Sequence, residues 1–86
     1  MNSEDFLPEL EELAVEMGMK IRYEKGDFDG GYCILKEEQI IVVNKKLHPS
    51  RKAAVIALAL GETGIENLFV KPNVRMFIED EMVRAR

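Results

Sequence analysis

The strongest structural signal in this sequence is a run of four β-branched residues, Ile40-Ile41-Val42-Val43. β-Branched side chains favour strands, and successive residues of a strand point to opposite faces of a sheet. The run therefore predicts a strand that has no polar face. Strands of this kind have both faces covered, so the rest of the chain must supply cover on two sides.

Two further strands are predicted before this run. Alternating apolar and charged residues indicate the first, at residues 19–24, with one face exposed to water. The second, at residues 32–35, follows a glycine-rich turn in which Asp29-Gly30 is a strong hairpin signal. Residues 36–39 form a polar turn before the third strand. Three strands in this order predict an antiparallel meander.

Three helices are predicted by apolar residues that recur with a period of 3.6. The first covers residues 6–17 and carries its glutamates on the outer face. The second begins at Pro49, should be the central packing helix, and ends at Gly61 and Gly64. The third begins at Pro72. Residues 1–86 should therefore form one α+β domain: an N-terminal helix, a three-stranded antiparallel β-meander, then two helices packed on the sheet.

The charge balance excludes some partners. The chain has a net charge of −4, and its first 16 residues contain acidic residues but no Lys or Arg. We therefore expect no nucleic acid partner, because binding a polyanion requires a basic surface.

No apolar run is long enough to span a bilayer, and the acidic N-terminus is unlike a secretory signal. With a single cysteine, these features favour a cytoplasmic protein that does not bind membranes.

The chain offers few residues for catalysis or metal binding. Cys33 lies in an apolar strand run, which predicts a small buried hydrophobic residue rather than a nucleophile. His48 precedes Pro49, where its side chain can approach free backbone N–H groups of the helix. One Cys and one His match no zinc-ligand spacing, and Asp27 to Gly31 fits a turn better than a calcium loop. We expect no metal, no cofactor and no catalytic residue.

Basic residues gather at the start of the second helix. Free N–H groups and the helix dipole favour anions at such a place. The alternative is a solvated, positively charged rim that balances the acidic first helix. The possible anion or partner contacts are Lys45, Lys46, His48, Arg51 and Lys52.

Asn44 follows the β-branched run directly, and the helix after it ends in Ile56-Ala57-Leu58-Ala59-Leu60-Gly61-Glu62. This segment resembles the core of small zincin metallopeptidases, of the kind that cleave phage repressors or control the bacterial radiation response. The resemblance extends in element order over about residues 6–62. The helix of that family carries a His-Glu-x-x-His motif. The resemblance aligns Leu58 with the first zinc histidine, Ala59 with the general-base glutamate, and Glu62 with the second histidine.

These replacements imply a decayed scaffold that has lost zinc and the base that would activate water. The chain also resembles small cytosolic bacterial proteins of unknown function, a resemblance that implies no activity.

Three functions stay open. The first is a non-catalytic protein-interaction module on the decayed zincin-like scaffold. The second is a small enzyme with an atypical carboxylate or lysine site, for which Glu62, Asp27 and Lys46 are available. The third is a weak anion-binding module at the start of the second helix.

The third strand also predicts a protein contact. Only residues 65–86 are left to cover the second face of the sheet. If they pack beside the other helices, an apolar patch stays exposed and favours a homodimer or another protein partner. If the last helix crosses the sheet instead, it completes a monomeric core.

Overall fold

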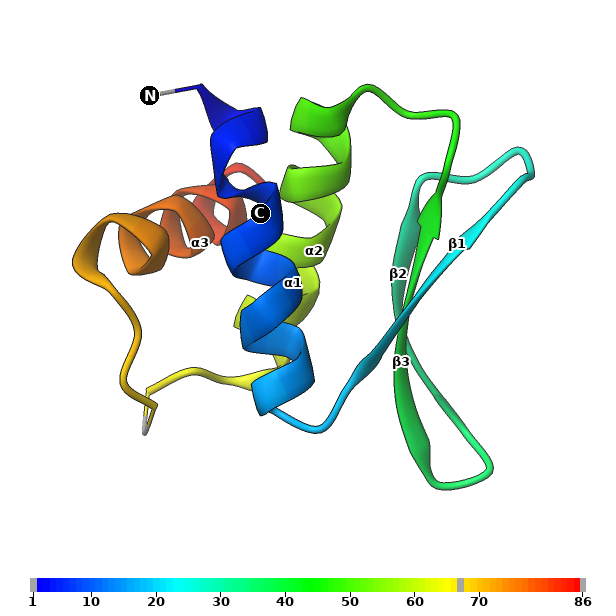
Figure 1. Cartoon of the computed structure of the whole chain (residues 1–86), viewed down its shortest axis with the longest axis horizontal. Helices are drawn as coiled ribbons and strands as arrows, with labels where there is room; N and C mark the ends of the chain where they lie inside the picture. The colour runs from blue at the N-terminus through cyan, green and yellow to red at the C-terminus, as the bar shows by residue number, and fades with distance from the viewer. Residues whose placement is uncertain (1, 67, 86) are drawn as a thin grey trace.

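The central element of the fold is helix α2 (Pro49–Thr63), which contacts every other layer of the molecule (Figure 1). The computed structural model describes residues 2–66 and 68–85. The other elements, in chain order, are η1 (Ser3–Phe6), α1 (Leu7–Glu16), β1 (Lys20–Glu24), β2 (Gly30–Leu35), β3 (Glu38–Asn44) and α3 (Pro72–Arg84). The protein is α+β, as the sequence predicts, and none of the described helices is long and apolar enough to cross a membrane.

The sheet has the strand order β1-β3-β2, so the predicted antiparallel meander is wrong. β1 pairs with β3 in parallel, and β2 pairs with β3 antiparallel. The reason lies in β3 itself. Because its side chains are apolar on both faces, its burial is best satisfied in the middle of the sheet, between the two less apolar strands.

The chain passes from one edge of the sheet to the other through the loop at residues 25–29, and Asn44 holds this loop in place. Asn44 Nδ2 donates to Gly26 O at 2.8 Å and to Phe28 O at 2.7 Å. Asn44 Oδ1 accepts from Lys46 N at 3.0 Å. Asn44 as a whole is 8% exposed, so these bonds are shielded from water. One residue at the end of β3 thereby links both neighbouring loops.

One face of the sheet packs against α1 and α2. Ile41 and Val43 of β3 point to this face and are fully buried with Leu10, Ile56 and Leu60 of the helices. α3 lies on the side of α2 away from the sheet (Figure 1), so only one of the two last helices packs on the sheet. The α2–α3 contact is close at Gly61, where a Cβ would meet the Met82 side chain. Gly61 is thus an interior residue of α2, and the helix ends at Thr63 with Gly64 as its C-cap.

No helix covers the other face of the sheet within the described chain (Figure 1). On this face Ile40 is only 3% exposed, because it lies between its register partners Lys20 and Cys33. Lys20 Nζ also pairs with Glu38 Oε1 at 3.0 Å across this face. Neighbouring side chains therefore supply part of the cover that the sequence requires.

Candidate binding surface

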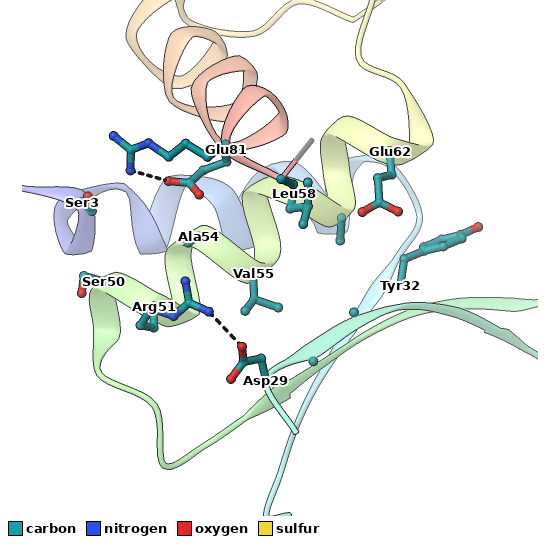
Figure 2. Close-up of a pocket in the computed structure, with 15 residues that line it drawn as sticks. Ser3, Asp29, Tyr32, Ser50, Arg51, Ala54, Val55, Leu58, Glu62 and Glu81 are labelled. Atoms are coloured by element: carbon teal, nitrogen blue, oxygen red, sulfur yellow. Dashed lines mark hydrogen bonds and ion pairs between the residues drawn. The ribbon is translucent and has the colours of Figure 1, made fainter. Parts of the chain in front are cut away.

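An open hollow of about 670 Å³ lies where α2, the start of β2 and the end of α3 meet (Figure 2). One face of α2 forms its floor, because Ala54, Val55, Leu58 and Ala59 follow the helical period. Val55 and Ala59 are buried, whereas Ala54 and Leu58 are half-buried. The floor is therefore apolar and partly open to solvent.

Charged side chains stand around this floor in opposite signs. Arg51 Nη2 pairs with Asp29 Oδ2 at 2.9 Å, and Arg84 Nη1 pairs with Glu81 Oε1 at 3.4 Å (Figure 2). Glu62, at the far end of the floor, is exposed. The rim thus carries two ion pairs and one further carboxylate, and it does not concentrate charge of either sign. An apolar segment with polar flanks fits such a surface better than a small ion does.

The residues aligned with the zinc motif all line this hollow. Leu58 and Glu62 lie one helical turn apart on the same face of α2, and Ala59 lies beside Leu58. Asp27 and Lys46 are absent from the lining, so Glu62 stands there without the two other residues considered for an atypical enzyme site. Within the described residues, no group of three or more His, Cys, Asp or Glu side chains is placed to hold a metal ion.

His48 is the N-cap of α2, as its position before Pro49 predicts. His48 Nδ1 accepts from Ser50 N at 3.1 Å, and Nε2 lies 3.9 Å from Glu4 Oε2. The amides of Arg51 and Lys52 donate to His48 O at 2.8 and 3.0 Å. The first N–H groups of the helix therefore have partners within the chain.

The other basic residues at this helix start point to different partners. Arg51 pairs with Asp29, and Lys52 Nζ lies 5.4 Å from the centroid of the Tyr23 ring. Lys45 and Lys46 are exposed in the turn before the helix. An anion contact at these residues stays a prediction.

Tyr23 connects three elements beside this helix start. Its hydroxyl donates to Glu11 Oε2 of α1, and Lys52 of α2 covers its ring. Burial, followed by the hydrogen bond and the negative charge of Glu11, raises the pKa of Tyr23 well above its usual range. No sequence pattern signals this contact, because the helical period places Glu11 with the other glutamates on the outer face of its helix.

β2 forms one edge of the sheet, next to the hollow. Cys33 is exposed there, so its predicted burial is wrong. The prediction failed because it assumed a strand with neighbours on both sides, whereas β2 pairs only with β3 among the described strands. Ile34 and Leu35 are 65% and 52% exposed. The edge strand therefore presents apolar side chains to solvent.

Sequence reasoning missed Asp29, Glu81 and Arg84 as parts of this surface. The sequence pattern places Asp29 in a hairpin turn, and Glu81 and Arg84 belong to α3, a separate helix later in the chain. No local pattern signals that α3 returns to the rim of the hollow.

A search of protein-family models, curated proteins and solved structures gives no match for this chain.

Proposed function

We propose that this chain is a non-catalytic protein-binding module and that it binds through the hollow and the edge of β2. The observation that carries the proposal is an uncharged edge strand, Gly30–Leu35, beside the apolar floor of α2. Natural sheets protect their edges with charged residues, proline or a covering segment. β2 has none of these among the described residues.

The opposite edge of the sheet is a built-in comparison. β1 carries Lys20, Arg22 and Glu24, and all three make ion pairs at the surface. Such charges oppose pairing with another strand. The two edges therefore differ in charge: β1 carries charged side chains that oppose the addition of a partner strand, and β2 carries none.

An extended partner segment would use both parts of this surface. Its backbone would bond to the outer edge of β2, and its alternate side chains would point into the hollow. An apolar side chain buried over Ala54 and Leu58 would contribute about 1.5–3 kcal/mol to the free energy of binding. The mixed charges of the rim would fix its register.

The zincin resemblance supports the non-catalytic part of the proposal. The positions aligned with zinc ligands and base are occupied by Leu58, Ala59 and Glu62, and these residues line the hollow. Leucine and alanine offer no lone pair to a metal and no base to water. On this proposal the scaffold has kept a groove for polypeptide and lost the chemistry.

A display library of unstructured ten-residue peptides tests the proposal. We expect enriched peptides to move the backbone amide resonances of residues 30–35 and 54–62. Leu58→Glu should weaken their binding at least tenfold, because it places a charge in the apolar floor. Val83→Glu is the matched control, since Val83 is 65% exposed on α3 and lies outside the hollow. Peptides that bind both variants equally, or that move other residues, would contradict the proposal.

A further inference from the structure

We infer that the partner at this surface is a second copy of the chain, paired antiparallel through β2 with Cys33 at the twofold axis. The inference rests on the proposed function, because it names the partner of the same surface. It follows from the charge of the edge strand, the register that its length allows, and the position of the hollow.

When a strand pairs with the same strand of a second copy, charged residues of that strand can face one another. The charges of an edge strand therefore affect whether it can pair with its own copy. Like charges directly opposite each other destabilise a strand pair. A pair centred on Arg22, the middle residue of β1, would bring Arg22 against its own copy, and the charged side chains of β1 already pair within the chain. β2 contains no charged residue between Gly30 and Leu35, so its self-pairing has no such cost.

The register follows from symmetry. A twofold axis perpendicular to the sheet keeps the helix-covered faces of both copies on the same side of the joined sheet. Residues that face each other across the new strand pair must therefore lie on the same face, and the axis passes between one residue and its own copy. Centring on Cys33 sets Tyr32 opposite Ile34 and Gly31 opposite Leu35, all within the strand. An aromatic residue facing a β-branched residue is a favourable cross-strand pair.

The neighbouring registers are worse. Centring on Ile34 sets Tyr32 against Lys36, whose φ of +51° belongs to the turn rather than to a strand. Centring on Tyr32 sets Leu35 against Asp29, an apolar side chain against a charged one that already pairs with Arg51. Centring on Cys33 therefore pairs residues 31–35 within the strand and leaves only Gly30 without a partner in it.

The hollow supplies the second contact that such a dimer needs. Two short strands alone bury less than the surface of about 800 Å² per partner found in stable interfaces. With this symmetry both helical layers lie on the same side of a six-stranded sheet, and the two hollows face each other across the axis. The half-buried Ala54 and Leu58 and the exposed Ile34 would then be covered by the other copy.

Oxidative crosslinking tests the register, because Cys33 is the single cysteine of the chain. Diamide accepts two electrons and two protons from two thiols, which leaves a disulfide. We expect the wild-type chain to form a disulfide-linked dimer at least tenfold faster than Cys33→Ser/Val83→Cys, whose thiol sits on α3 at a site that is also exposed. Ile34→Lys should slow the crosslinking of Cys33 to the control rate and leave the protein monomeric by light scattering.

A wild-type chain that is monomeric at high micromolar concentration, or whose Cys33 crosslinks no faster than the control thiol, would overturn the inference. The peptide experiment separates this failure from failure of the proposed function. Peptides that still bind at residues 30–35 would leave the function standing with a different partner. In a true dimer the same peptides should compete with the second copy and return the protein to a monomer.

Discussion

At the scale of single residues, Asn44 shows how one side chain fixes a topology. β1 and β2 lie on opposite sides of β3, so the loop at residues 25–29 must cross the end of the central strand. The Asn44 amide satisfies two carbonyl groups of this loop and one N–H group of the next turn. No apolar residue could do so, because buried backbone polar groups need hydrogen-bond partners.

Asn44→Ala should lower the free energy of unfolding by about 2–3 kcal/mol, since three backbone groups lose a shielded partner. Asn44→Asp should cost more at neutral pH, because it sets a carboxylate against the carbonyl oxygens of Gly26 and Phe28. Urea unfolding measures both changes. Gln39→Ala on the same strand is the control, since Gln39 is exposed, and it should change stability by less than about 0.5 kcal/mol. Equal effects at the two positions would contradict the role of Asn44.

Tyr23 gives the protein a dependence on alkaline pH. Because folding raises the pKa of Tyr23, the folded state keeps the phenol proton at pH values where the unfolded chain loses it. The stability from this group is complete below the unfolded pKa of about 10 and declines as pH rises above it. Tyr23→Phe lacks this group, so the stability gap between wild type and variant should narrow above about pH 10. Urea unfolding of both proteins from pH 8 to 11 tests this, and parallel profiles would refute it.

At the scale of elements, the sequence predicted each helix and strand to within a few residues but not how the strands pair. Alternation in β1 shows which side chains share a face, and this is the same whether the neighbour is parallel or antiparallel. The apolar run of β3 demanded cover on both faces, from which its central place follows. The predicted meander is wrong because it places strands that are neighbours in sequence next to one another in the sheet.

The β2–β3 turn is a place where the sequence is at odds with the backbone. Lys36 and Glu37 have φ of +51° and +70°, a conformation that side chains with a Cβ adopt at a cost. Lys36→Asn/Glu37→Gly supplies the residues that two-residue hairpin turns prefer, so it should raise the free energy of unfolding by about 1 kcal/mol. Lys45→Asn/Lys46→Gly, in a turn without positive φ, should give no gain. A loss of stability in the first variant would show that the turn is not strained.

At the scale of the whole molecule, local sequence patterns predict the helix face that forms the floor of the hollow but not the hollow itself. The apolar floor of α2 and the cap at His48 can be read from local patterns, because helical period and proline position are local signals. The hollow itself needs α3 to return beside α2 and needs β2 at an edge. Both depend on contacts between distant segments. Neighbouring side chains supply only part of the cover for the second face of the sheet, because Cys33 and Leu35 stay exposed.

The proposal of a decayed scaffold makes a prediction about the molecule's capacity for zinc. The wild-type chain should bind no stoichiometric zinc, whereas Leu58→His/Glu62→His places two imidazoles one turn apart in the hollow that Glu81 also lines. We expect this variant to bind one zinc ion at micromolar concentration, measured by competition with a chelating dye. Leu58→His/Glu12→His is the matched control, since its second imidazole lies on α1, outside the hollow, and it should bind at least tenfold more weakly. Stoichiometric zinc in the wild-type chain would show that the chemistry was never lost, and equal affinity in the two variants would show that the geometry of the hollow has no part in binding.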